Sequence, residues 1–197
     1  MNNLIGIVAC GGQSSRMQTD KGLLQYHMLP QRYHVYHLLK QVCEDVYLSI
    51  NKAQEISIDS GYKYLIDDAE YENTGPISTL LTAKKQITHS SFLLIGCDYP
   101  MLDISDIEKL ISNRYKNYEA VAFVNTATNF AEPLLAIYEF ECLIKMEIYF
   151  NTNQFSLRHF LEDINTLFVE PKKINHIKSI DTIEEYELVL RNINNHE

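Results

Sequence analysis

The sequence predicts an α/β protein with a doubly wound, mostly parallel sheet flanked by helices. Short apolar runs of strand length recur along the chain, and stretches with helical periodicity separate them. Several of these runs are continuously apolar, as is typical of strands that are buried on both faces of a parallel sheet. The 197 residues contain no repeat, low-complexity tract or Pro/Gly/Ser-rich linker, so we expect a single domain over residues 1–197.

The first predicted strand is Leu4–Cys10, because its residues (LIGIVAC) are all apolar or glycine. Later apolar runs of similar kind predict further strands over residues 46–50, 64–66, 92–95, 120–124 and 134–138.

Apolar residues at helical spacing predict the helices between these strands. The first helix follows Pro30, and the second begins at Pro76, a residue that the first helical turn tolerates. The third has Asp103 or Ser105 as its N-cap, and the last follows the Thr-x-x-Glu capping-box pattern of residues 182–185. The predicted apolar faces are Val35, Leu38, Leu39 and Val42; Ile77, Leu80 and Leu81; Ile104, Ile107, Leu110 and Ile111; and Leu188 with Leu190.

The composition excludes several classes of protein. With 17 Lys and Arg against 26 Asp and Glu, the formal net charge is −9, which argues against a nucleic-acid coat protein but leaves room for a small anion-binding pocket. The apolar run that ends at Cys10 is too short for a signal peptide or a membrane span. The four cysteines lack metal-site spacing, which favours buried free thiols and a cytoplasmic protein.

The segment after the first predicted strand has the features of a phosphate-binding loop. Gly11 and Gly12 let the backbone approach an anion, Arg16 offers a planar guanidinium fork, and Lys21 offers a mobile point charge. The alternative is an ordinary Gly-Gly turn with solvated charges. The glycine spacing matches neither a P-loop nor a dinucleotide-binding fingerprint, which excludes both of those classes.

Acidic residues follow two other predicted strands, where ligands of a parallel sheet bind. Asp98 comes directly after the strand at 92–95, and there a carboxylate can hold Mg²⁺ against nucleotide phosphates. It could instead be a turn residue before Pro100. The acidic stretch at 67–72 could accept hydrogen bonds from a base or a ribose, or it could be only a solvated loop.

Several of these segments resemble one known family. Residues 9–17 (ACGGQSSRM), followed by Asp20-Lys21-Gly22, resemble the L-A-G-G-x-S-x-R-M-G-x-D-K signature of the molybdenum cofactor guanylyltransferases, which are MobA-like nucleotidyltransferases. Further segments are similar to stretches of the same family, in the family's order: residues 75–77 (GPI), 97–100 (CDYP), 132–138 (EPLLAIY), 156–158 (SLR) and 180–182 (IDT).

The resemblance implies a Rossmann-like fold of the nucleotide-diphospho-sugar transferase type. It also implies binding of GTP and Mg²⁺ and transfer of GMP to the terminal phosphate of Mo-molybdopterin, with contact to other proteins of molybdenum cofactor biosynthesis. By position it assigns Lys21 to the phosphates and Asp98 to the metal ion and the nucleotide. As catalytic residues we expect Arg16 and Lys21 to stabilise charge on the phosphoryl oxygens and Asp98 to hold Mg²⁺. The nucleotide-binding residues that the resemblance implies are Ala9, Cys10, Gly11, Gly12, Lys21, Asn51, Asp68 and Asp98.

The chain departs from the family pattern at several positions. Cys10 stands where the family usually has Ala, Gln18 where it has Gly, and Thr79 where Gly is common. The family's N-x-N-T-P stretch, associated with the pterin acceptor, reads SIDTI at 179–183, so Ser179 and Asp181 replace amides. A carboxylate beside an anionic acceptor is unfavourable. A molybdopterin cytidylyltransferase, another nucleotidyltransferase of this fold and a non-catalytic nucleotide-binding module therefore stay open as alternatives.

Overall fold

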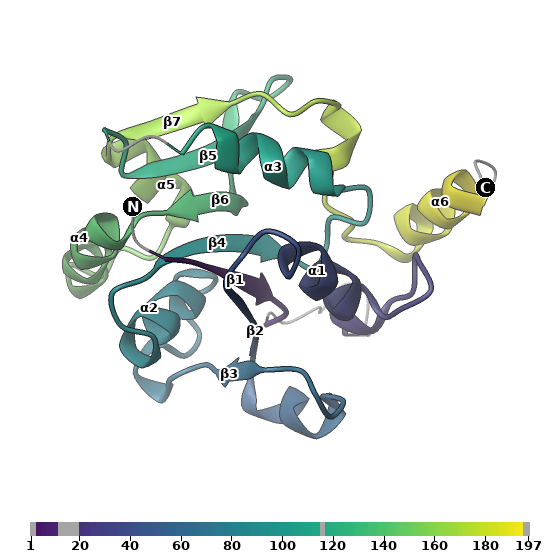
Figure 1. Ribbon diagram of the computed structural model, residues 1–197, viewed down its shortest axis with the longest axis horizontal. Helices are drawn as coiled ribbons and strands as arrows, with labels where there is room; N and C mark the ends of the chain where they lie inside the picture. Colours follow the sequence, from purple (N-terminus) through teal and green to yellow (C-terminus); the bar gives the residue numbers. More distant parts are fainter. Residues whose placement is uncertain (1–2, 12–19, 115–116, 195–197) are drawn as a thin grey trace.

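The computed structural model describes residues 3–11, 20–114 and 117–194 (Figure 1). Among them, seven strands form one sheet in the order β3-β2-β1-β4-β6-β5-β7. The strands are β1 (Leu4–Ala9), β2 (Asp45–Ile50), β3 (Tyr64–Ile66), β4 (Ser91–Gly96), β5 (Ala120–Asn125), β6 (Phe130–Tyr138) and β7 (Thr166–Val169).

The sheet is mostly parallel, as predicted. Strand β1 pairs in parallel with β2 and with the central strand β4, while β3 pairs in parallel with β2. Strand β6 runs antiparallel to both β4 and β5. The carboxyl ends of β1, β2, β3 and β4 therefore meet at one edge, where a doubly wound sheet binds its ligands.

Helices cover both faces of this sheet. Helices α1 (Gln31–Leu39) and α3 (Ile104–Ser112) contribute Val35, Leu39, Ile107 and Leu110 to one apolar core. Helices α2 (Ile77–Gln86), α4 (Phe140–Asn151) and α5 (Leu157–Asp163) pack into a second core on the other face. The last helix, α6 (Ile183–Asn194), extends away from the sheet (Figure 1).

Most predicted elements are present, with shifted ends. The first strand ends at Ala9 and not at Cys10, and α1 ends before Val42. The sequence analysis did not predict helices α4 and α5 or strand β7. It also did not predict the short 3-10 helices η1 (Lys21–Leu23), η2 (Lys52–Ser57), η3 (Ala69–Tyr71) and η4 (Ile174–Ile177). All four cysteines are buried free thiols, as expected. Across the described ranges, no helix has the length and apolarity needed to cross a membrane.

The N-terminus of α3 is capped by Asp103 and not by Ser105. The Asp103 carboxylate accepts hydrogen bonds from the backbone N–H groups of Ser105 (2.8 Å) and Asp106 (3.2 Å), and Asp106 accepts in return from the backbone of Asp103. At α6, Thr182 accepts from the backbone of Glu185, but the Glu185 carboxylate accepts from Asp181, one residue before its capping-box partner.

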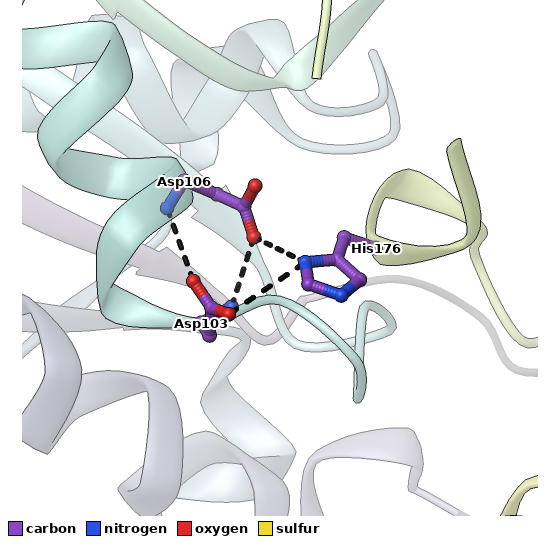
Figure 2. A group of neighbouring side chains, drawn as sticks. All are labelled: Asp103, Asp106 and His176. Atoms are coloured by element: carbon purple, nitrogen blue, oxygen red, sulfur yellow. Dashed lines mark hydrogen bonds and ion pairs between the residues drawn. The ribbon is translucent and has the colours of Figure 1, made fainter. Parts of the chain in front are cut away.

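A buried contact between an aspartate and a histidine connects α3 to η4 (Figure 2). Asp106 is fully buried, and its Oδ2 lies 2.6 Å from Nδ1 of the buried His176. Because a buried polar group that loses its hydrogen-bond partner is strongly destabilising, we expect His176→Ala to lower the free energy of unfolding by about 3 kcal/mol in urea titrations. The exposed His159 is the matched control, and His159→Ala should change that free energy by less than about 0.5 kcal/mol. Equal losses in both variants would contradict this account of the pair.

Candidate functional site

A cavity of about 800 Å³ opens at the carboxyl ends of the parallel strands. This volume is within the range of small-ligand sites. Segments that follow β1, β2, β3 and β4 form its walls. The lining residues are Ala9, Cys10, Gly11, Lys21, Asn51, Lys52, Ala53, Asp67, Glu72, Asn73, Gly75, Pro76, Ser78, Thr79, Cys97, Asp98 and Leu134.

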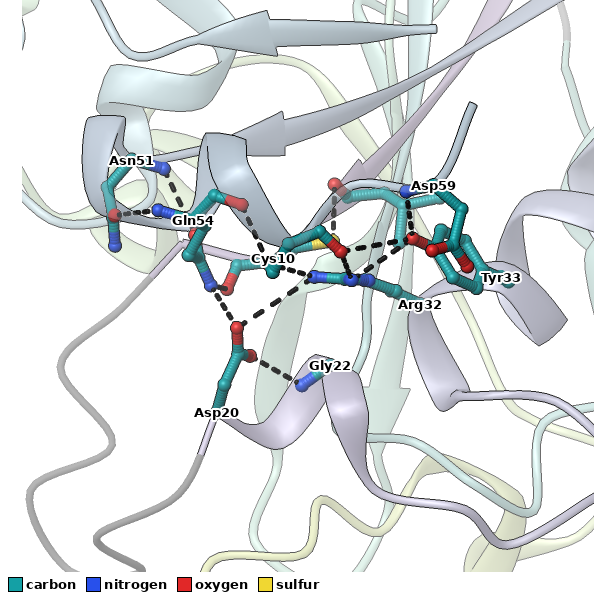
Figure 3. Close-up of polar contacts among 10 residues, drawn as sticks. Cys10, Asp20, Gly22, Arg32, Tyr33, Asn51, Gln54 and Asp59 are labelled. Atoms are coloured by element: carbon teal, nitrogen blue, oxygen red, sulfur yellow. Dashed lines mark hydrogen bonds and ion pairs between the residues drawn. The ribbon is translucent and has the colours of Figure 1, made fainter. Parts of the chain in front are cut away.

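The predicted phosphate loop begins at this cavity. Ala9, Cys10 and Gly11 line it, whereas Gly12, Gln18 and the predicted catalytic Arg16 lie outside the described residues. The loop's two flanks are held together by Gln54, whose Nε2 donates to the carbonyl of Cys10 (3.1 Å) and to Asp20 Oδ2 (2.8 Å) (Figure 3).

A buried arginine, Arg32, lies next to the contact between Gln54 and Asp20. The Arg32 side chain is only 1% exposed and donates through Nη1 to the hydroxyl of Ser57 (3.0 Å) and through Nη2 to the Ser57 carbonyl and the hydroxyl of Tyr33 (Figure 3). Its Nη1 also lies 4.0 Å from Asp20 Oδ2. Arg32 thus ties the start of α1 to η2 and lies beside Asp20.

Two predicted catalytic residues meet at the cavity. Lys21 Nζ lies 3.8 Å from Asp98 Oδ2, although 77 positions separate the two residues in the sequence. Lys21 also forms a close ion pair with Asp181, one of the residues that depart from the family pattern. The positive charge of Lys21 offsets the negative charge of this carboxylate. The backbone N–H of Ile180 donates to the Asp98 carbonyl (2.9 Å), so the segment before α6 lies against the same site.

The Asp98 carboxylate bends back over Gly96. A Cβ atom at position 96 would lie 2.5 Å from Asp98 Oδ1, so only glycine leaves room for the carboxylate there. Burial raises the pKa of Asp98, while the nearby Lys21 opposes this shift. Oδ1 is buried and has no hydrogen-bond partner among the described residues, so this oxygen is able to take a cationic ligand.

The predicted nucleotide-binding residues Asn51 and Asp68 differ in their placement. Asn51 lines the cavity, and its side chain caps η2 by accepting from the backbone of Gln54 (3.1 Å). Asp68 is not among the lining residues: its carboxylate accepts from the backbone of Glu70 and pairs with Lys85 at 2.7 Å. The preceding acid, Asp67, lines the cavity instead.

Asp103, Asp106 and His176 form a separate group whose ligand atoms are close enough to hold a metal ion (Figure 2). None of the three lines the cavity. The Asp103 carboxylate caps α3 and Asp106 Oδ2 contacts His176, whereas the buried Asp106 Oδ1 has no hydrogen-bond partner among the described residues.

The sequence analysis did not predict Gln54 or Arg32 near the site, and it included Asp67 only as part of the acidic stretch at 67–72. Gln54 stands three residues after Asn51, the spacing of a capping box, and that signal could have been read. Arg32 carried no signal, because an arginine at the start of a helix is normally solvent-exposed.

Comparisons with known proteins identify the family of this chain. Residues 6–167 match the family model described as the MobA-like NTP transferase domain. The chain is 28% identical over 187 residues to a molybdenum cofactor biosynthesis bifunctional protein of Synechocystis, a match that covers 93% of this chain but about half, 52%, of that relative. It is 25% identical to a probable molybdenum cofactor guanylyltransferase of Halalkalibacterium halodurans, over 91% of this chain and 92% of the relative.

Among solved structures, the molybdopterin-guanine dinucleotide biosynthesis protein A of Archaeoglobus fulgidus superposes with a TM-score of 0.79 at 15% identity, over 97% of this chain and 99% of that one. This likeness confirms the Rossmann-like nucleotidyltransferase fold. The family match spans the phosphate loop, the cavity walls and Asp98, and so includes the whole lining of the site. The chain therefore belongs to the MobA-like NTP transferase domain family.

Proposed function

We propose that this protein transfers GMP from GTP to the terminal phosphate of Mo-molybdopterin and releases pyrophosphate, as a cytoplasmic enzyme of molybdenum cofactor biosynthesis. The proposal depends on one observation above all: Lys21 and Asp98 converge on a cavity large enough for a nucleotide. The motif order and the names of the relatives support guanylyl transfer, and contact with other proteins of cofactor biosynthesis belongs to the same proposal.

The arrangement suits in-line phosphoryl transfer. The acceptor phosphate attacks the α-phosphorus of GTP, an oxygen–phosphorus bond forms, and the bond to the leaving pyrophosphate breaks. The acceptor is already an anion at neutral pH, so the reaction needs no general base. We assign charge stabilisation on the phosphoryl oxygens to Lys21, and to Arg16 from the loop that the structure does not describe.

The donor set at Asp98 fits Mg²⁺. The ion prefers hard oxygen ligands and usually takes one or two carboxylates together with substrate phosphates, and Asp98 offers a buried oxygen without a hydrogen-bond partner among the described residues. Asp98 would hold the ion, which when bound neutralises phosphate charge. The remaining nucleotide contacts that we propose are the backbone of Ala9, Cys10 and Gly11 and the side chain of Asn51, which line the cavity, together with Gly12 outside the described residues.

Pyrophosphate release tests the proposal. Purified protein is mixed with Mg²⁺, Mo-molybdopterin and GTP, CTP or ATP in separate reactions, and pyrophosphate is measured together with the nucleotide product. Release that needs both GTP and the acceptor supports guanylyl transfer. Exclusive use of CTP would make the protein a cytidylyltransferase, and binding of nucleotide without release would make it a binding module.

Asp181 competes with the nucleotide for Lys21 in this account. Its carboxylate is 49% exposed, so we expect a modest effect: Asp181→Asn should tighten GTP binding in the absence of Mg²⁺ about threefold, measured by calorimetry with EDTA present. Asp163→Asn, an exposed acid at the end of α5, is the control and should leave the affinity unchanged. Weaker binding by the Asp181 variant would show that Asp181 holds Lys21 in its binding position.

A further inference from the structure

Two cysteines occupy facing positions at the wall of the cavity. Cys10 follows β1, Cys97 follows β4, and both residues line the cavity. The parallel register of these strands ends with Ala9 opposite Gly96, so the next residue of each strand is a cysteine. The backbone N–H of Cys97 donates to the carbonyl of Ala9 (3.1 Å), which continues the strand pairing to this point. The fold therefore brings together two thiols that are 87 positions apart in the sequence.

The two side chains lie on the same face of the sheet and contact each other. Both belong to the apolar core that contains α1 and α3. Hydrogen bonding to the Cys10 thiol is the main cause that raises the pKa of Cys97 well above its ordinary value, and burial adds to the shift. Cys10 Sγ itself donates to the carbonyl of Val8 (3.5 Å), so its sulfur accepts from the Cys97 thiol.

The facing thiols are a feature of this chain. Cys10 stands where the family pattern usually has alanine, whereas Cys97 belongs to the segment CDYP that is similar to the family. The other two cysteines, Cys43 and Cys142, are also buried, but neither lines the cavity. Only Cys10 and Cys97 therefore combine contact between thiols with a place at the cavity wall.

We propose that Cys10 and Cys97 form a reversible disulfide when a peroxide enters the cavity, and that this bond weakens nucleotide binding. Hydrogen peroxide oxidises the Cys10 thiol to a sulfenic acid, its O–O bond breaks, and one water leaves. The Cys97 sulfur then attacks the sulfenic sulfur, so that the S–S bond forms, the S–O bond breaks, and a second water takes up the Cys97 proton. The two thiols are oxidised by two electrons in total, and the peroxide is reduced.

The positions of the two residues allow this bond, but they also require a movement. Neighbouring strands are about 4.8 Å apart, which is within the about 4.4–6.8 Å that a disulfide allows between Cα atoms. The Cβ atoms of a disulfide lie about 3.8 Å apart, so its formation draws the ends of β1 and β4 together by about 1 Å.

This movement acts on the start of the phosphate loop. On the side of β2, the N–H of Cys10 donates to the carbonyl of Ser49 (3.0 Å), and the carbonyl of Cys10 accepts from Gln54 (3.1 Å). A shift of Cys10 toward β4 pulls against both contacts. Because a displacement of about 1 Å in a site can cost about a hundredfold, we expect the disulfide form to bind GTP at least about tenfold more weakly. This effect on binding rests on the proposed function, whereas the disulfide does not.

Peptide mapping tests the disulfide directly. Trypsin leaves the four cysteines on four separate peptides, with Cys10 on residues 1–16 and Cys97 on residues 86–109. The reduced protein is treated with hydrogen peroxide, quenched with catalase, alkylated and digested without a reductant. We expect a cross-link between these two peptides and a fall in the number of free thiols from four to two. Dithiothreitol should restore all four.

Two variants provide matched controls. Cys43→Ala removes a buried thiol outside the cavity lining and should keep the cross-link. Cys10→Ala removes one partner, and it should give no cross-link and the same affinity for GTP before and after peroxide. Calorimetry of the wild type should instead show GTP binding that is at least about tenfold weaker after peroxide and is restored by dithiothreitol.

The outcomes separate the cysteine pair from the proposed function. Four thiols that survive peroxide, or a cross-link to Cys43 or Cys142, overturn the disulfide. A bond between Cys10 and Cys97 that leaves GTP affinity unchanged overturns its effect on binding. A reduced protein that binds no nucleoside triphosphate overturns the proposed function and that effect, whereas the cross-link then still supports the cysteine pair.

Discussion

Replacing Asp98 by asparagine should lower kcat for pyrophosphate release about a thousandfold, which corresponds to about 4 kcal/mol of charge stabilisation. The amide fills the same space above Gly96 but has no negative charge with which to hold a divalent cation. Initial rates at saturating GTP and Mg²⁺ measure the effect. GTP binding without metal should persist, because Lys21 and the loop backbone stay in place.

The stability of the Asp98 variant distinguishes lost chemistry from lost folding. The pKa of Asp98 is raised by burial, so the ionised side chain destabilises the fold at every pH above its ordinary range, where the unfolded chain is already ionised. A neutral amide lacks this penalty, and Asp98→Asn should therefore unfold at the same or a higher urea concentration than the wild type at neutral pH. A variant that is stable and turns over normally would remove Asp98 from the mechanism.

The second large effect is expected at Lys21. Lys21→Met keeps the length of the side chain and removes the charge that faces the phosphates, so we expect kcat/KM for GTP to fall about a hundredfold or more. Lys63→Met, at an exposed lysine paired with Asp45 outside the cavity lining, is the control and should keep the wild-type value. A loss of similar size in both variants would indicate a general effect of net charge.

The parallel half of the fold could be predicted because its strands are buried on both faces. Continuous apolar runs such as those in Leu4–Ala9 and Ser91–Gly96 are typical of strands buried inside a parallel sheet. The location of the site then follows, because the loops after parallel strands meet at one edge of the sheet. Lys21 and Asp98 could therefore be paired from sequence alone. Strand β7 was not predicted because it is a four-residue edge strand with only one buried residue.

The details of the site depend on contacts that the sequence does not reveal. Asp67 and Asp68 are adjacent residues of the same type, so the sequence alone does not distinguish them, and the family resemblance indicated Asp68 as the nucleotide-binding acid. Tertiary contacts separate them: Lys85, from the end of α2, neutralises Asp68, whereas Ser49, from within β2, orients Asp67. Asp181 likewise seemed unfavourable until the fold placed Lys21 against it.

The proposed reaction requires a nucleoside triphosphate that occupies the cavity together with a cation held by Asp98. Calorimetric titration of GTP into the wild type and into Asp98→Asn, each with and without Mg²⁺, tests this directly. We predict that Mg²⁺ tightens GTP binding to the wild type at least tenfold, about 1.4 kcal/mol, and leaves the variant nearly unaffected. No heat with GTP, or the same Mg²⁺ effect in both proteins, would contradict the account.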